Sequence, residues 1–151
     1  YSVVRTHRTP MTQKGYLTNL ASEFYVISVL SRLGLDASLT LGNRKRVDIT
    51  VILEEGKALT IDVKAVAGKM DWLLGNSKFH MANNHFVVLV SYEGRFSNPF
   101  HLPRVWIVPS VKLEPFVKIA GNDKTRYLSR KTFLADGEEF ENAWKLISGA
   151  F

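Results

Sequence analysis

Cysteine is absent from this sequence of 151 residues. Its absence excludes disulfide bonds, thiol catalysis and cysteine-based zinc sites, and it is typical of proteins in a reducing compartment. Long hydrophobic runs are absent as well, because no stretch approaches the roughly 18 apolar residues that indicate a membrane span. No apolar segment behind a basic start indicates a signal peptide. We therefore expect a cytoplasmic protein with no membrane partner.

The composition that is present is ordinary for a globular protein, apart from an excess of positive charge. Hydrophobic residues make up 46% and charged residues 23%, which favours a packed core over disorder. The chain has 20 Lys and Arg against 14 Asp and Glu, for a net charge of +6. An acidic partner such as nucleic acid is the natural candidate for this excess. A charge that serves only solubility explains it equally well.

The excess of positive charge is concentrated near the start of the chain. Residues 1–50 hold 7 basic and 3 acidic residues, residues 51–100 hold 5 of each, and residues 101–151 hold 8 and 6. Residues 1–14 are polar, basic and aperiodic, which predicts a flexible basic arm. Residues 15–151 are expected to form a single domain, since the length suits one core and no linker interrupts it.

Hydrophobic periodicity predicts an α/β protein with a mixed sheet. A long helix is expected over 15–33, a broken helix over 69–85, a short helix near 111–117 and a final helix over 138–148. Strands are expected at 38–41, 47–53, 59–64, 86–90 and 105–108, with a loop over 120–136. This order predicts an α+β arrangement in which a central mixed β-sheet is flanked by helices.

Two of the expected strands carry charged residues. Asp62 and Lys64 are two positions apart, so their side chains share one face of a strand. Asp48 lies on the preceding strand, and a turn near Gly56 is expected to pair the two strands. The opposite face is aliphatic and must be core, so the charged face is either a site or a solvated surface. On a solvated surface, Asp62 and Lys64 would form an ion pair that contributes little to stability.

Glu23 is expected on the buried side of the first helix. The residues three and four positions away are Asn19, Leu20, Val26 and Ile27, which are mostly apolar. A carboxylate on such a face needs a partner, because an unpaired buried charge is strongly disfavoured. A cation from the strand pair or a metal ion would meet this need.

These charged residues together resemble the motif of the PD-(D/E)xK nuclease superfamily. The residues that carry the resemblance are Glu23, Asp48 with Val47 before it, and the triplet Asp62, Val63 and Lys64. It covers about residues 15–108 and implies a restriction-endonuclease-like core. Junction resolvases and some homing and small restriction endonucleases are of this type, so the resemblance leaves all three open. The sequence departs from the motif at Val47, where a proline is usual.

The resemblance implies a metal-dependent endonuclease that hydrolyses DNA phosphodiester bonds. Its catalytic residues would be Asp48, Asp62, Lys64 and Glu23, and Mg²⁺ (or Mn²⁺) would be bound by Asp48, Asp62, the carbonyl of Val63 and Glu23. A hard divalent ion prefers such oxygen ligands and activates water for attack on phosphate. Lys64 would position that water and stabilise negative charge.

The resemblance also bears on partners. Cleavage of both DNA strands implies a homodimer or a higher symmetric oligomer, and DNA as the substrate implies association with the nucleoid. Two alternatives stay open on the sequence alone. One is a non-catalytic nucleic-acid-binding module of the same fold, and the other is a structural or partner-binding subunit.

Two basic clusters are candidates for DNA contacts. Arg44, Lys45 and Arg46 directly precede Asp48 and are placed to contact phosphates beside the site, or else form a solvated turn. A later cluster lies in the expected loop. It contains Arg126, Arg130 and Lys131, together with Lys124, and either follows a DNA backbone or is a solvated surface.

Histidine and tryptophan residues are the remaining candidates. His80 and His85 are five positions apart, which favours a polar loop over a metal site. Trp72, Trp106 and Trp144 are expected to be buried in the core or an interface rather than to stack on bases.

Overall fold

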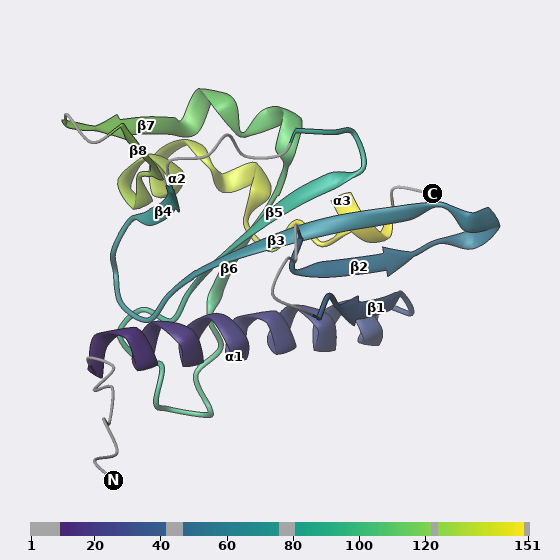
Figure 1. The fold of residues 1–151 in the computed structure, drawn as a ribbon, viewed down its shortest axis with the longest axis horizontal. Coiled ribbons are helices and arrows are strands. Elements are labelled where there is room, and N and C mark those ends of the chain that lie inside the picture. The colour runs from purple at the N-terminus through teal and green to yellow at the C-terminus, as the bar shows by residue number, and fades with distance from the viewer. Residues whose placement is uncertain (1–9, 42–46, 76–80, 122–123, 150–151) are drawn as a thin grey trace, which may run out of the picture.

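The computed structural model describes residues 10–41, 47–75, 81–121 and 124–149 (Figure 1). The strands are β1 (Asp36–Leu39), β2 (Ile49–Ile52), β3 (Ala58–Val66), β4 (Trp72–Gly75), β5 (His85–Ser91), β6 (Arg104–Pro109), β7 (Val117–Ala120) and β8 (Thr125–Leu128). The α-helices are α1 (Pro10–Arg32), α2 (Arg130–Asp136) and α3 (Lys145–Ser148). Short 3₁₀ turns lie at Glu54–Gly56, Ser110–Lys112, Glu114–Phe116 and Glu138–Phe140.

The strands form two sheets. The large sheet has five strands in the order β1-β2-β3-β5-β6, and the small sheet has three in the order β4-β8-β7. Within the large sheet β3 and β5 are parallel and the other neighbours are antiparallel, so the sheet is mixed. Figure 1 shows α1 along one side of this sheet, with the small sheet and α2 on the other. The mixed sheet flanked by helices that the sequence predicted is therefore confirmed.

Because successive side chains of a strand point to opposite faces of the sheet, the hydrophobic core has two layers, one on each face of the large sheet. Ile61 and Val63 on β3 pack with Val26 and Leu30 of α1. Val66, which lies on the opposite face of β3, belongs to the second layer, beneath the small sheet and α2. All seven residues of β5 are buried, because this central strand is covered on both faces.

The tryptophans pack inside the protein, as the sequence predicted. Trp72 and Trp106 are buried, and their rings meet edge-to-face with centroids 5.4 Å apart. Phe133 of α2 completes the group at 6.0 Å from Trp72. Trp144 is partly buried against the first core layer. This aromatic cluster holds the small sheet and α2 onto the large sheet.

Strand β3 extends beyond its neighbour β2, and this difference in length creates an open strand edge. The antiparallel register ends at the pair Ile49 and Ile61, whereas β3 continues along β5 as far as Val66. Among the described residues, no strand pairs with β3 on the β2 side after Ile61. Backbone groups of β3 that point toward this edge are therefore available for other partners.

Three predictions of secondary structure were wrong. The broken helix expected over 69–85 contains the strand β4, which pairs with β8. The loop expected over 120–136 contains β8 and α2. The helix expected over 138–148 is interrupted at Asn142, whose φ of 52° is incompatible with a right-handed helix. These short elements depend on pairing with distant segments, which local periodicity does not report.

The first helix begins at Pro10, within the segment predicted to be an arm. Proline is favoured at the first helical position, because its missing N–H would have no partner there. Residues 1–9, which make up most of the predicted arm, lie outside the described residues. None of the helices described is long and apolar enough to span a membrane.

Candidate functional site

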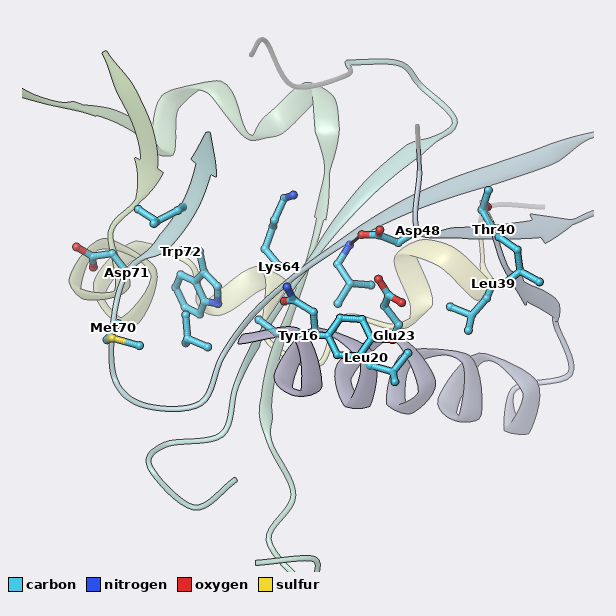
Figure 2. Close-up of a pocket in the computed structure, with 16 residues that line it drawn as sticks. Tyr16, Leu20, Glu23, Leu39, Thr40, Asp48, Lys64, Met70, Asp71 and Trp72 are labelled. Atoms are coloured by element: carbon cyan, nitrogen blue, oxygen red, sulfur yellow. Dashed lines mark hydrogen bonds between the residues drawn. The ribbon is translucent and has the colours of Figure 1, made fainter. Parts of the chain in front are cut away.

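An open pocket of about 1040 Å³ lies between α1, the open edge of β3 and the segment leading into β4 (Figure 2). Its charged lining residues are Glu23, Asp48, Lys64 and Asp71, and its apolar walls include Leu20, Val63, Met70 and Trp72. The pocket thus brings together three of the four catalytic residues that the sequence predicted, from three different elements.

Asp48 is fixed at the open edge by the backbone of β3. Its N–H donates a hydrogen bond to the carbonyl of Ile61, at 3.0 Å. Its Oδ2 accepts a hydrogen bond from the N–H of Val63, at 2.7 Å. The carboxylate therefore accepts the hydrogen bond from β3 that a longer β2 would otherwise accept through its backbone. This arrangement anchors a negative charge beside the backbone of Val63.

Glu23 reaches the same pocket from α1. The residue is only 8% exposed, as its apolar helical neighbours predicted. In Figure 2 its carboxylate points from the helix toward β3 and Asp48. Both carboxylates therefore face one cavity, although they lie on elements that are separate in the sequence.

Lys64 and the carbonyl of Val63 complete the β3 side of the pocket. Lys64 lines the pocket and its side chain extends away from α1 (Figure 2). The N–H of Thr60 donates to the carbonyl of Asn84 on the β5 side. The N–H and C=O groups of the even-numbered residues of β3 therefore point toward β5. Because these directions alternate along a strand, the carbonyl of Val63 points toward the open edge, as the N–H that bonds Asp48 does.

Asp62 differs from the expected arrangement. Its Oδ2 lies 3.3 Å from Nε2 of His85, and Asp62 is not part of the pocket lining. Asp48 precedes β2 and lies at the strand edge against Val63, whereas Asp62 lies beside His85 of the neighbouring strand β5. Within the described ranges, no group of three or more His, Asp or Glu side chains is placed to hold a metal ion.

The expectation of a polar loop around the two histidines was wrong for His85, and His80 lies outside the described residues. His85 is the first residue of the central strand β5 and is 1% exposed. The apolar run that follows it, from Phe86 to Val90, was the sequence signal that could have placed it on a buried strand.

The structure describes only some of the predicted DNA-binding residues. Arg44, Lys45 and Arg46 lie outside the described residues. Lys131 is exposed on α2, and Arg126 is partly buried on β8. Lys124, which directly precedes β8, is exposed and has a φ of 54°.

Arg130, another predicted DNA-binding residue, is paired with an acidic residue in the structure. Its guanidinium donates to both carboxylate oxygens of Glu93, at 2.7 and 2.8 Å, and to Oγ of Ser91, at 3.0 Å. The side chain of Arg130 is only 11% exposed. These contacts attach α2 to the end of β5, and they leave the side chain of Arg130 little exposed for a phosphate contact.

Comparisons with known proteins define the class of the fold. No protein-family model and no curated protein matches the sequence. Among solved structures, the fold is similar to a nuclease-like α/β core. One similar structure is that of a bacterial homing endonuclease, I-Ssp6803I, with a TM-score of 0.55 and 17% sequence identity. The match covers 89% of this chain and 93% of that chain, so the likeness extends over the whole fold.

Proposed function

We propose that this chain is a metal-dependent endonuclease of the PD-(D/E)xK type that hydrolyses phosphodiester bonds in DNA. One observation carries the proposal. The carboxylate of Asp48 is held 2.7 Å from the N–H of Val63 at an open strand edge, and Glu23 and Lys64 line the same pocket. The likeness to a homing endonuclease supports it at the level of the fold.

The chemistry of the residues at this edge fits Mg²⁺ or Mn²⁺. Mg²⁺ keeps several waters and binds through one or two carboxylates together with phosphate oxygens of the substrate. Asp48 and the carbonyl of Val63 would hold the ion, with Glu23 on the α1 side; Asp62, which lies against His85 outside the pocket lining, would have to turn toward the edge to join them. A divalent ion bound there would neutralise charge on the phosphate and lower the pKa of a bound water.

The protein's own residues have separate roles in this proposal. The ammonium group of Lys64 stabilises the negative charge that develops on the phosphate and orients the attacking water. Glu23 holds a water molecule on the α1 side of the pocket. The apolar walls formed by Leu20 and Trp72 reduce the local dielectric constant, which strengthens these charge interactions.

The DNA backbone is proposed to extend from this pocket onto the small sheet and α2. Residues from Met70 to Leu73, which lead into β4 and begin it, form one wall of the pocket, so this sheet adjoins the site directly. Lys118 on β7, Lys124 and Lys131 are exposed on this part of the molecule. Cleavage of both strands of a duplex would require two copies, as a homodimer or a higher symmetric oligomer.

Metal-dependent cleavage is the direct test of the function. We expect the protein to cut plasmid, branched or single-stranded DNA when Mg²⁺ or Mn²⁺ is present and to leave it intact in a chelator. Ca²⁺ should support binding without cleavage, which separates the two steps. DNA binding without cleavage under every metal condition would instead favour a non-catalytic binding module of the same fold.

Salt dependence tests the proposed DNA path. Replacing Lys118, Lys124 and Lys131 together by alanine should make the plot of log affinity against log salt shallower by up to about three units, because each phosphate contact releases counterions. A double variant at Lys57 and Lys145, which are exposed elsewhere on the fold, is the control and should keep the parental slope. The measurement is a DNA titration in Ca²⁺ at several salt concentrations. A parental slope in the triple variant would remove the small sheet and α2 from the DNA path.

A further inference from the structure

Three large hydrophobic side chains that line the proposed active-site pocket are mostly exposed. Tyr16, Met70 and Leu73 all line the pocket, and they are 64%, 60% and 68% exposed. Single hydrophobic residues exposed on a surface are ordinary, but several that line one concave site mark a binding surface. Tyr16 lies on α1, whereas Met70 and Leu73 lie before and within β4. Two separate elements therefore bring hydrophobic surface to the pocket that holds Asp48, Glu23 and Lys64.

The charges of the pocket are divided about Lys64. Figure 2 shows the carboxylates of Asp48 and Glu23 on one side of Lys64, and Met70 and Asp71 on the other. Among the described residues that line the pocket, Lys64 is the single Lys or Arg. The side that holds Met70 thus has no cation for a phosphate, and Asp71 there would repel one. A neutral and flat group suits this side of the pocket better than a phosphate does.

A nucleobase is the neutral, flat group that DNA offers. In the proposed function a phosphate lies at Lys64, so the nucleotide joined to it on the side away from Asp48 would lie against Met70 and Leu73. Base pairing and stacking hide the faces of a base inside a duplex, and only its edges are open in the grooves. The face of a base is free for an aromatic or aliphatic side chain when that nucleotide is unpaired.

We propose that Tyr16, Met70 and Leu73 bind an unpaired nucleobase next to the phosphate at Lys64. The substrate class is then DNA with a single-stranded nucleotide at the cleavage position. The inference rests on the proposed function, which places the phosphate at Lys64. Phosphates further along the strand would still reach the exposed lysines of the small sheet and α2. Stacking of one base on an aromatic side chain typically changes affinity by about 5- to 100-fold.

Two single strands that differ only in their bases test this contact. One is oligothymidylate, and the other has the same length and the same phosphates but an abasic site at every position. In Ca²⁺, the parent should bind oligothymidylate about 5- to 100-fold more tightly than the abasic strand. Tyr16→Ala should bring this ratio close to one while its affinity for the abasic strand stays parental. Tyr16→Phe, which keeps the ring, should keep the parental ratio.

A matched control is available in Phe100, an aromatic residue that is 93% exposed and does not line the pocket. Phe100→Ala should keep the parental ratio of affinities. Equal affinity of the parent for the two strands overturns the inference, and so does a parental ratio in Tyr16→Ala. If circular dichroism shows that Tyr16→Ala is not folded, Leu73→Ser takes its place and should lower the ratio several-fold. A parental ratio in folded Leu73→Ser then overturns the inference.

Cleavage in Mg²⁺ distinguishes this inference from the proposed function. The parent should cut a duplex that carries unpaired thymidines in one strand faster than the fully paired duplex, and Tyr16→Ala should reduce this difference. If the parent cuts both duplexes equally well, the proposed function stands and the inference is overturned. If the parent cuts no DNA with any metal but shows the ratio of affinities that Tyr16→Ala removes, the base site stands and the catalytic function is wrong.

Discussion

Replacing Lys64 by methionine is expected to slow DNA cleavage about 100- to 1,000-fold, the range typical of losing one group that stabilises transition-state charge. Lys64 lines the pocket beside Asp48 and Glu23, where an ammonium group can contact the phosphate. Methionine preserves most of the aliphatic stem, so the packing of β3 should survive. The measurement is the single-turnover cleavage rate in Mg²⁺ with enzyme in excess over DNA.

DNA affinity in Ca²⁺ is the companion measurement for Lys64→Met. It should change much less than the cleavage rate, because the proposed role concerns the reaction more than binding. Lys57→Met is the matched control, since Lys57 is an exposed lysine at the β2–β3 turn, outside the pocket. Cleavage by Lys64→Met at the parental rate would show that the pocket assignment is wrong.

Replacing Arg130 by alanine is expected to lower the free energy of unfolding by about 3 to 5 kcal/mol, the usual loss when one partner of a buried ion pair is removed. The side chains of Arg130 and Glu93 are only 11% and 17% exposed, and two hydrogen bonds join them. Without the guanidinium, Glu93 would keep an unpaired charge in a poorly solvated position. Urea denaturation measures the loss, because one cooperative transition is expected for a domain of this size.

Arg104 supplies a matched control for this prediction. Its guanidinium also forms two hydrogen bonds to one carboxylate, that of Glu141, at 2.8 and 3.0 Å. Those side chains are 38% and 28% exposed, so solvent screens the pair much more strongly. Arg104→Ala should therefore lower the free energy of unfolding by about 1 kcal/mol. Equal losses of unfolding free energy in the two variants would show that burial of the ion pair does not determine the size of the loss.

The pair of Arg130 and Glu93 also gives stability a defined pH dependence. Burial alone would raise the pKa of the Glu93 carboxyl, but the hydrogen bonds and charge of Arg130, with the charges of Arg104 and Lys69, hold that pKa below its ordinary value. A carboxyl whose pKa is lower in the folded state stabilises the fold above its unfolded-state pKa. This contribution should be lost as pH falls below about 4.3, the ordinary value for glutamate. Glu93→Gln should show a weaker loss of stability over the same acid range.

The sequence by itself determined the parts of the molecule that depend on local spacing. Alternation placed the segments 47–53 and 59–64 in strands with one aliphatic face, and the structure has β2 and β3 there. The apolar neighbours of Glu23 indicated a buried carboxylate, which the structure has at the pocket. These predictions succeed because a repeat of two or of 3.6 residues fixes which side chains share a face, whatever the rest of the chain does.

The tertiary structure alone decided which charged groups are partners. The spacing of Asp62 and Lys64 suggested one shared site, but Asp62 contacts His85, 23 residues later, because β3 and β5 are parallel neighbours. Arg130 belonged to a basic cluster in the sequence, yet it pairs with Glu93, which follows β5. The energy of a buried charge depends on the groups within a few ångströms of it, and the packing of distant segments determines those groups.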